Sequence, residues 1–341
     1  MDRPPVTVLM PVYNGQKYLR EAVDGILAQT FSDFEFLVID DGSTDDTPQI
    51  LQSLQDARIS VIRSDTNTGL AASLNKGIRL ARGGFIARMD CDDISLPARL
   101  ERQVAFMNAN ASVGVCGTGA ICFGDGKEQR WRHPASDAAI RARLFFGNSI
   151  VHSSAMIRRS VLTDNNLGYD ESLDCAQDYD LWTRISRHTK LANLDEPLVR
   201  YRVHKFGITG TTPEKDDFIT PIRLAQLRRL VPEPSDDEVC AHLNLCASRR
   251  VEKRSQLADT IGWAHFLQEK NRAAGYSLPE REFLAELSGR LFAFCHLHTR
   301  FGMFAWRNFR KSGLSRSAPV NISQRIRFFA KCLLKYDSSR R

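Results

Sequence analysis

The chain has 341 residues, 43% of them hydrophobic, which predicts one large α/β domain with a smaller addition. No stretch approaches the roughly 18 apolar residues of a membrane span, and the N-terminal MDRPPVTVLM lacks the build of a signal peptide. The eight cysteines form no C-x-x-C pair, so we expect a cytoplasmic protein with reduced thiols and no zinc site.

The net charge of +7 is concentrated at the C-terminal end of the sequence. Ten basic residues against one aspartate give residues 301–341 a charge of +9, which leaves −2 for the other 300 residues. The rest of the chain is therefore close to neutral. Because no recognition motif is interleaved with the basic residues, a nucleic-acid partner is not expected.

Strand and helix patterns alternate through the first 120 residues. Apolar runs predict strands over residues 6–10, 34–40, 59–63 and 85–90. Apolar residues at helical spacing predict helices over 17–29, 45–54, 69–81 and from Pro97 onward, and a turn is expected from Pro11 to Gly15. This order predicts a mostly parallel, Rossmann-like sheet flanked by helices, with ligands at the carboxyl ends of the strands.

The pattern becomes less regular after residue 120. It predicts a strand with a hairpin-like turn over 114–126, a strand running into a helix over 148–162, a helix over 175–188 and a strand over 198–204 before a glycine-containing loop. From residue 216 onward the pattern is helical. We therefore expect one domain over residues 1–215 and a helical, basic region over residues 216–341.

Polar side chains follow three of the predicted strands. Tyr13 and Asn14 follow the first, Asp41 the second, and Asp90 and Asp92 the fourth. Two carboxylates about 4 Å apart repel by roughly 1 kcal/mol even in water, so an acidic turn at a strand end favours a cation site over a merely solvated turn. Mg²⁺ and Mn²⁺ take oxygen ligands and commonly use only one or two carboxylates when they also bind phosphates.

Two common nucleotide-binding classes do not fit these residues. The turn VYNGQKY has one glycine, unlike the G-x-G-x-x-G of dinucleotide-binding dehydrogenases, and the sequence has no G-x-x-x-x-G-K-[ST] of P-loop proteins. Phosphate charge would have to be balanced in another way, and a cation held by the acidic turn would do so.

The motifs resemble those of a known family. They are VTVLMPVYNGQKYLREAVDGILAQTFSDFEFLVIDDGSTDDT and then NTGLAASLNKGIRLARGGFIARMDCDDISLPARLERQ. These stretches, within about residues 5 to 210, are similar to the nucleotide-sugar domain of family 2 inverting glycosyltransferases, which have the GT-A fold. The resemblance implies transfer of a sugar from a nucleotide diphosphate donor, most often a UDP-sugar, to a saccharide or lipid-linked acceptor in surface polysaccharide or glycolipid assembly.

The resemblance also implies which residues bind the nucleotide sugar. Pro11, Tyr13 and Asn14 would line the nucleoside pocket, and Asp41 would bind the edge of the base. His152, in IVHSSAMIRR, would lie close to the diphosphate or the acceptor. An ordinary turn, a helix-capping acid and a hydrogen-bonded structural histidine are the alternative interpretations of these positions.

The catalytic and metal-binding residues follow in the same way. Asp92 would bind Mn²⁺ or Mg²⁺ beneath the diphosphate, Asp90 would bind the ribose side or the metal, and His204, in YRVHKFGIT, would complete the metal site. Asp178, in AQDYDLWTR, would be the general base, with Asp180 as its rival. A surface histidine and an acid that favours the helix dipole are the simpler interpretations of His204 and Asp178.

Two positions depart from the family pattern. Gln177 stands where a glutamate commonly precedes the base, and Leu74 stands where many members carry an arginine near the diphosphate. Neither change removes a required group. A binding subunit without turnover and a sugar nucleotidyltransferase remain alternatives to the glycosyltransferase.

The C-terminal stretch NISQRIRFFAKCLLKY has an amphipathic pattern. Its apolar residues at helical spacing are Ile322, Ile326, Phe329, Leu333 and Tyr336. Arg327, Lys331 and Lys335 lie opposite. This pattern predicts a helix on an anionic membrane surface, so that the protein would be peripheral on the inner face of the membrane. The alternative is a helix packed on its own domain with its basic side in solvent.

Overall fold

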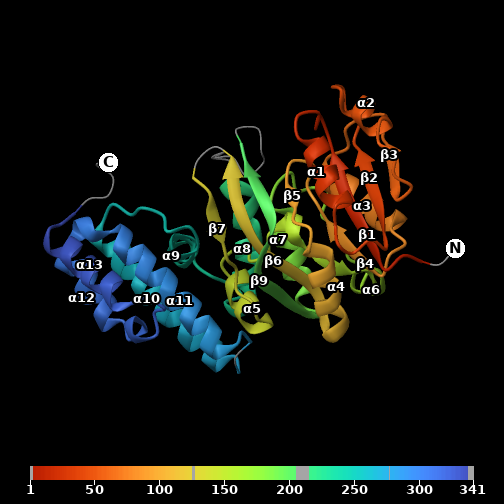
Figure 1. Cartoon of the computed structure of the whole chain (residues 1–341). Helices are drawn as coiled ribbons and strands as arrows, with labels where there is room; N and C mark the ends of the chain where they lie inside the picture. The colour runs from red at the N-terminus through yellow and green to blue at the C-terminus, as the bar shows by residue number, and fades with distance from the viewer. Residues whose placement is uncertain (1–2, 125–126, 205–214, 276, 337–341) are drawn as a thin grey trace. The chain divides into compact units, whose positions relative to one another are not determined.

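The computed structural model of the protein describes residues 3–124, 127–204, 215–275 and 277–336 (Figure 1). They form two compact units. Unit 1 comprises Met1–Ile140 and Asn148–Phe218, and unit 2 comprises Arg141–Gly147 and Ile219–Arg341. The short segment 141–147 therefore packs with the C-terminal helices, although unit 1 both precedes and follows it in the sequence.

Unit 1 is a mixed α/β structure built on one sheet, with the strand order β3-β2-β1-β4-β8-β6-β9-β5 and with β7 paired to β6. The strands are β1 (Val6–Val12), β2 (Phe34–Asp40), β3 (Ile59–Arg63), β4 (Phe85–Arg88), β5 (Ile94–Ser95), β6 (Val113–Gly124), β7 (Gln129–Trp131), β8 (Met156–Arg158) and β9 (Lys190–Val203). The helices are α1 (Leu19–Leu27), α2 (Thr47–Gln52), α3 (Leu70–Leu80), α4 (Arg99–Ala109), α5 (Asp137–Leu144, whose last residues belong to unit 2), α6 (Arg159–Asp164) and α7 (Gln177–Ile185).

Strand β1 lies inside the sheet, and all of its residues are buried. Val8 and Met10 share one hydrophobic core with residues of α1 and α4. Successive side chains of a strand point to opposite faces, and on the other face Leu9 meets α3. The packing there is so close that a Cβ on Gly77 would lie 2.1 Å from Cδ1 of Leu9. Helices therefore cover both faces of the sheet.

The N-terminal half of the sheet confirms the predicted α/β fold. Strands β3, β2, β1 and β4 run parallel, and β6 and β9 are also parallel. The remaining pairs are antiparallel: β4 with β8, β5 with β9, and β6 with both β7 and β8. The strands predicted over residues 34–40 and 59–63 begin and end where β2 and β3 do.

The turn predicted to start at Pro11 is wrong, because β1 continues through Pro11 to Val12. Pro11 is paired with Ile39 of β2, whereas the pairing of β1 with β4 ends at Leu9. The backbone carbonyl of Leu9 accepts a hydrogen bond from Met89 on the β4 side, so Pro11, two residues later, faces that same side. A proline has no backbone N–H to donate. It is tolerated at this position because β4 has already ended, so no hydrogen bond of the sheet is lost.

Strand β9 is much longer than the strand predicted over residues 198–204. It runs parallel to β6 with a register irregularity opposite Thr118 and Gly119, where Asp195, Glu196 and Pro197 interrupt the apolar pattern. This interruption resembles a turn in the sequence and conceals the first half of the strand. The turn expected at residues 125–126 and the glycine-containing loop expected after residue 204 lie outside the described residues.

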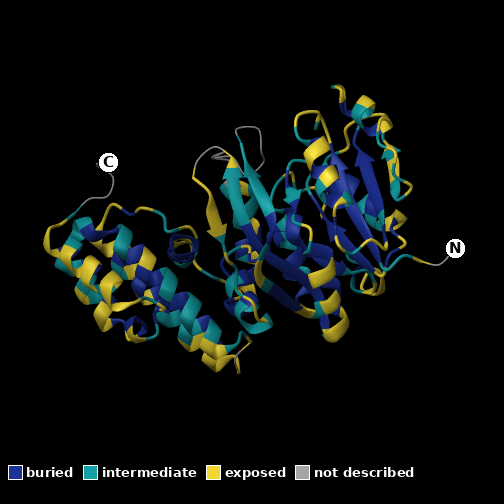
Figure 2. Ribbon diagram, viewed as in Figure 1, coloured by how far each residue is buried: buried dark blue, intermediate teal, exposed yellow. Residues whose placement is uncertain are grey.

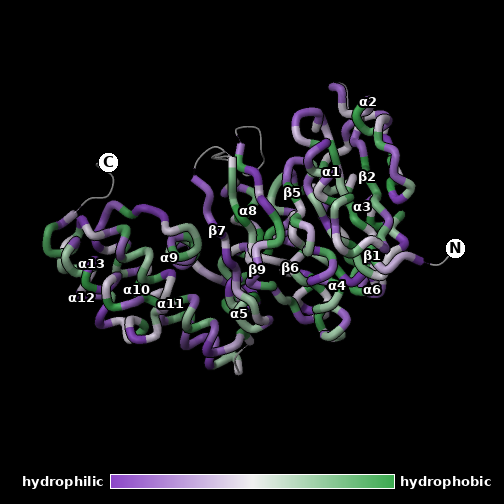
Figure 3. Tube along the Cα trace, viewed as in Figure 1, coloured by the Kyte–Doolittle hydropathy of each residue, from purple (hydrophilic) through white to green (hydrophobic). Residues whose placement is uncertain are grey.

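From residue 215 onward, the described part of the chain contains helices and no strand. Its helices are α8 (Lys215–Leu230, which starts at the end of unit 1), α9 (Asp236–Ala247), α10 (Arg254–Ala273), α11 (Glu280–Leu297), α12 (Met303–Lys311) and α13 (Ile322–Leu333). Hydrophobic and hydrophilic residues alternate along these helices (Figure 3). Phe145 and Phe146, from segment 141–147, join His242 and Phe283 in an aromatic core. No helix within the described ranges is long and apolar enough to cross a membrane.

Candidate active site

An acidic turn follows β4 at the carboxyl end of the parallel strands. One ligand atom each of Asp90, Asp92 and Asp93 lies within 4.8 Å of the others. Burial raises the pKa of Asp92, and the negative charge of Asp90 raises it further. The turn therefore concentrates negative charge in a partly water-excluded place, as the sequence predicted for a cation site.

Asp93 differs from the other two acids because it is buried. Its Oδ1 accepts a hydrogen bond of 2.7 Å from the backbone N–H of Arg202, and its Oδ2 is hydrogen-bonded to the hydroxyl of Ser153. Burial raises the pKa of Asp93 well above its usual value, and the charges of Asp90 and Asp92 add to this effect. Asp93 is thus committed to protein contacts, whereas Asp90 and Asp92 are only partly buried.

Ser153 links two of the acids. It belongs to the short 3₁₀ helix His152–Ser154, and its Oγ lies 2.8 Å from Oδ2 of Asp90 as well as in contact with Asp93. A hydroxyl has one hydrogen and can donate it to only one carboxylate at a time. Ser153 therefore donates either to Asp90 or to Asp93 at any one time.

Arg88 is a site residue that the sequence reasoning missed. It is the last residue of β4, its side chain is buried, and its guanidinium forms an ion pair with Asp90. Nη1 of Arg88 also lies 3.4 Å from Oγ of Ser153. The available signal was an arginine inside the apolar run FIARM, since a charge is rarely buried in a strand without a partner.

His204 comes to the acidic turn from the far end of β9. Its Nε2 lies 2.9 Å from Oδ2 of Asp92. The approach follows from the sheet, because β5 starts directly after the turn and pairs with β9 at Ile94 and Arg200. Arg202 also connects the end of β9 to the acidic turn, because its Nε donates a 2.7 Å hydrogen bond to the backbone carbonyl of Asp92. Of the three residues predicted to bind a metal, the structure thus places His204 against Asp92, and Asp92 close to Asp90.

Asp178 lies in the first turn of α7, away from the acidic turn. Its Oδ2 accepts a 2.6 Å hydrogen bond from the amide of Asn148, and its Oδ1 accepts one of 2.7 Å from the backbone N–H of Tyr179. Burial raises the pKa of Asp178, while these two donors and Arg88 act in the opposite direction. Ala176, which precedes the helix, has a φ of 62°, a left-handed conformation that is uncommon for a residue other than glycine.

The rival carboxylate, Asp180, is held elsewhere. Its carboxylate is paired with Arg184, one turn later in α7: Nε of Arg184 lies 2.8 Å and Nη2 lies 2.6 Å from Oδ2 of Asp180. This ion pair occupies Oδ2 of Asp180 within its own helix. The geometry favours Asp178 over Asp180 as a base.

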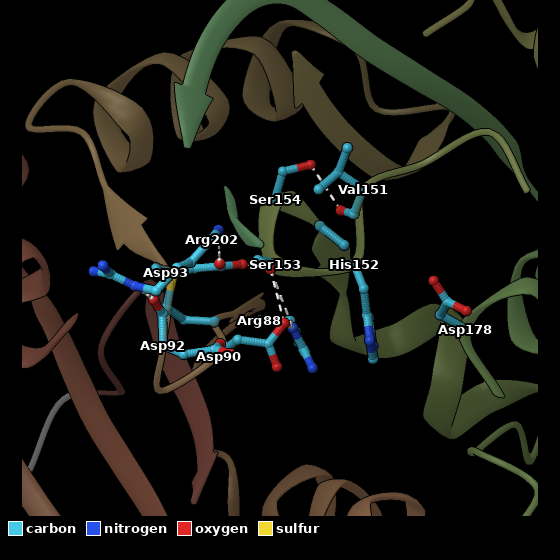
Figure 4. Close-up of polar contacts among 12 residues, drawn as sticks. Arg88, Asp90, Asp92, Asp93, Val151, His152, Ser153, Ser154, Asp178 and Arg202 are labelled. Atoms are coloured by element: carbon cyan, nitrogen blue, oxygen red, sulfur yellow. Dashed lines mark hydrogen bonds and ion pairs between the residues drawn. The ribbon is translucent and has the colours of Figure 1, made fainter. Parts of the chain in front are cut away.

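His152 lies between the two acidic groups in the view of Figure 4, with Arg88 and Asp90 on one side and Asp178 on the other. Its Nε2 is 2.8 Å from the hydroxyl of Tyr169. Burial, together with the charge of Arg88, lowers the pKa of His152 well below its usual value. The ring is therefore neutral near pH 7 and can offer a hydrogen bond but no charge.

The four residues predicted to bind the nucleoside lie at the ends of β1 and β2. These strands are adjacent and parallel, with Val12 paired to Asp40, so their carboxyl ends share one edge of the sheet. Tyr13 is 46% exposed, whereas Pro11 is buried. Asn14 has a φ of 51°, and its side-chain carbonyl accepts a 2.9 Å hydrogen bond from the backbone N–H of Thr44.

Asp41 has a structural role that the sequence left open. Its Oδ1 accepts hydrogen bonds from the backbone N–H and the hydroxyl of Thr68, at 3.0 and 2.7 Å. Its Oδ2 accepts one of 2.8 Å from the backbone N–H of Gly69, the residue before α3. The buried carboxylate thus organises the loop that leads into α3, and its contact with a base stays a prediction.

The sequence and the fold have known relatives. Residues 7–165 match the family model described as Glycosyl transferase family 2. MJ1057 of Methanocaldococcus jannaschii, named as an uncharacterized glycosyltransferase, is 32% identical over 239 residues, which are 67% of this chain and 77% of that protein. The O-antigen biosynthesis glycosyltransferase WbnJ of Escherichia coli is 32% identical over 209 residues, 58% of this chain and 80% of that protein.

A solved structure shows the same fold. The crystal structure of S. aureus TarS 1–349 has a TM-score of 0.56 at 19% sequence identity, over 91% of this chain and 89% of that one. The mixed α/β sheet, the helical C-terminal region and these relatives agree with the motifs that end β1, β2 and β4. The chain therefore belongs to glycosyl transferase family 2 and is a glycosyltransferase with the GT-A fold.

Proposed function

We propose that the protein transfers a sugar from a nucleoside diphosphate donor to an acceptor hydroxyl, with inversion at the anomeric carbon and with the help of a divalent cation. The observation that carries this proposal is the pair of acidic groups on either side of His152 (Figure 4). One is the Asp90–Asp92 turn and the other is Asp178, whose pKa is raised by burial and, to a smaller extent, by the charge of Asp90. In an in-line displacement the base and the leaving group lie on opposite sides of the reacting carbon, so the groups that assist them must lie on opposite sides of the site.

The residues of the acidic turn fit a Mn²⁺ or Mg²⁺ ion. Asp90 and Asp92 supply carboxylate oxygens, His204 supplies a ring nitrogen, and all three are only partly buried. Arg88 is paired with Asp90, so one positive side chain offsets part of the local negative charge. A bound ion would supply the positive charge that stabilises the departing nucleoside diphosphate. Asp93 and Ser153 would hold the turn in shape behind these ligands.

Asp178 is proposed as the general base. The amide of Asn148 and the backbone N–H of Tyr179 fix the orientation of its carboxylate. Its raised pKa makes it a better proton acceptor for the acceptor hydroxyl than an ordinary aspartate. A base in this position typically contributes about 10²- to 10⁴-fold to the rate. Neutral His152 would orient the diphosphate or the acceptor through a hydrogen bond.

The nucleoside is proposed to lie at the ends of β1 and β2, against Tyr13 and Asn14, with Asp41 at the edge of the base and Pro11 beneath. We propose UDP as the nucleotide because the motifs resemble those of a family whose donors are most often UDP-sugars. TarS, which shares the fold, has been crystallised with UDP-GlcNAc. A saccharide or lipid-linked acceptor in surface polysaccharide or glycolipid assembly is proposed, and the role of WbnJ in O-antigen biosynthesis agrees with this choice.

The test is a panel of nucleotide sugars incubated with the purified protein and Mn²⁺ or Mg²⁺, with donor binding followed by titration calorimetry and donor hydrolysis by nucleoside diphosphate release. We expect Asp92→Ala to lose metal-dependent donor binding. Asp178→Asn should bind the donor like the parent protein but lose turnover by about 10²-fold or more. Asp180→Asn is the matched control in the same helix and should keep turnover.

Three outcomes would contradict the proposal. Donor and metal binding by Asp92→Ala as tight as in the parent would remove the metal site from the acidic turn. Loss of turnover in Asp180→Asn but not in Asp178→Asn would show that Asp180, and not Asp178, is the base. Release of pyrophosphate instead of a nucleoside diphosphate would indicate a nucleotidyltransferase.

A further inference from the structure

Helix α13 in unit 2 exposes an apolar face. Of the eight large hydrophobic side chains that are exposed among the described residues, five lie between positions 322 and 334. They are Ile322 (76% exposed), Ile326 (62%), Phe329 (36%), Leu333 (57%) and Leu334 (79%). The solvent-exposed side of α13 is visible in Figure 2. Single exposed apolar residues need no explanation, but a contiguous group of this kind usually marks an interaction site.

The exposed face belongs to a helix that is firmly attached to unit 2. Phe328 and Cys332, on another side of α13, are buried, and the Phe328 ring packs against Phe292 and Phe309. At the start of the helix, Asn321 and Gln324 form a capping box. The structure therefore shows a helix packed on its own unit, which was the alternative interpretation, but it packs through Phe328 and Cys332 and leaves the predicted apolar stripe exposed. Tyr336, expected on the same stripe, lies beyond the end of α13.

Uncompensated positive charge lies on the same part of unit 2. Helix α12 contacts α13 through Trp306 and Phe329. The basic side chains of these two helices, some of them on the side of α13 opposite the stripe, are Arg325, Arg327, Lys331, Lys335, Arg307, Arg310 and Lys311. None of them forms an ion pair with a carboxylate of the described residues. Their long side chains can bend so that the charge stays in water while the stem covers apolar surface.

We propose that this surface of α12 and α13 binds an anionic lipid bilayer, with α13 lying in the plane of the interface. An anionic lipid surface offers an apolar layer for the stripe and negative charge for the basic side chains of α12 and α13. A second copy of the same face would bring like positive charges together, so charge complementarity disfavours self-association through it. The proposal rests on unit 2 alone and is independent of the sugar chemistry.

The experiment is co-sedimentation of the full chain with vesicles of phosphatidylcholine alone and with vesicles that contain about one third phosphatidylglycerol. We expect binding to the anionic vesicles that weakens as salt is raised, and little binding to the neutral ones. The double variant Ile326→Gln, Leu333→Gln should lower the partition coefficient by roughly tenfold or more. Both side chains point into solvent, so the substitutions leave the core of unit 2 intact. The charge variant Arg327→Gln, Lys331→Gln should weaken binding to anionic vesicles only.

Leu80→Gln is the matched control. Leu80 is an exposed leucine at the end of α3 in unit 1, and its replacement should leave vesicle binding unchanged. Absence of binding to anionic vesicles would overturn the proposal, as would equal binding by the double variant. A concentration-dependent dimer that the double variant abolishes, without vesicle binding, would assign the face to self-association instead. Donor hydrolysis, measured without vesicles, should be the same in all these variants, which separates this result from the proposed catalysis.

Discussion

Nε2 of His204 lies 2.9 Å from Oδ2 of Asp92, although 112 positions separate the two residues in the sequence. The antiparallel pairing of β5 with β9 produces this contact, since β5 continues directly from the acidic turn and β9 ends next to His204. The proposed metal ligands are therefore assembled by the sheet itself. Local sequence cannot reveal such an arrangement, because it depends on which strands become neighbours.

Replacement of His204 by alanine should weaken metal binding. The carboxylates of Asp90 and Asp92 would remain, so we expect a loss of about tenfold or more in Mn²⁺ affinity and a smaller loss than in Asp92→Ala. Calorimetric titration of Mn²⁺ in the presence of UDP measures this effect. His188→Ala, at an exposed histidine that follows α7, is the matched control. Unchanged Mn²⁺ affinity in His204→Ala would exclude the histidine from the site.

The pH dependence of donor hydrolysis should report Asp178. A base acts in its deprotonated form, so kcat/KM should fall as the pH decreases through the pKa of this carboxyl. Because burial raises that pKa above the usual 3.8, the acid limb of the profile should lie at higher pH than for an exposed aspartate. The same shift lowers the free energy of unfolding as the pH rises through the folded pKa, since the folded state then gives up a proton that it binds more tightly than the unfolded chain.

A variant of Asn148 distinguishes the titration of Asp178 from that of the other acids. Asn148 donates to its ionised carboxylate and so lowers the pKa; Asn148→Ala should therefore move the acid limb to still higher pH. The pH profile of kcat/KM, measured with saturating Mn²⁺, checks this direction. A limb that stays in place would mean that another group controls it.

Much of unit 1 was predictable because its signals are local. A mostly apolar run, FEFLVID, specifies β2. The ordered alternation of strands and helices leads to a parallel sheet with polar residues at one edge. The contacts around the acidic turn were not predictable. Ser153 and Arg202 reach it from distant segments, and nothing in their immediate sequence distinguishes them from ordinary surface residues. Arg88 carried a recognisable signal, a charged residue within an apolar strand.

Asp41→Asn should destabilise the protein in the absence of any ligand. The carboxylate accepts hydrogen bonds from Thr68 and from Gly69 at the start of α3, and an amide would turn one of its donors toward a backbone N–H. We expect a loss of about 1–3 kcal/mol in the free energy of unfolding, measured by urea denaturation. Asp65→Asn, at an exposed aspartate near the same loop, should have almost no effect. If the two variants were equally stable, the loop would not depend on this carboxylate.

Two neighbouring phenylalanines of α13 should behave differently because they face different surroundings. Phe328 is fully buried and packs against Phe292 and Phe309, so Phe328→Ala leaves a cavity and should lower the free energy of unfolding by about 3–5 kcal/mol. Phe329 is 36% exposed and contacts Trp306 at a ring distance of 5.2 Å, so Phe329→Ala should cost less than about 1 kcal/mol. Urea denaturation measures this difference in stability between the two variants. In vesicle co-sedimentation we expect the opposite order, because Phe329→Ala should lose lipid binding while it stays folded. Equal destabilisation would mean that both faces of the helix are packed against protein, which is incompatible with a lipid-binding surface on α13.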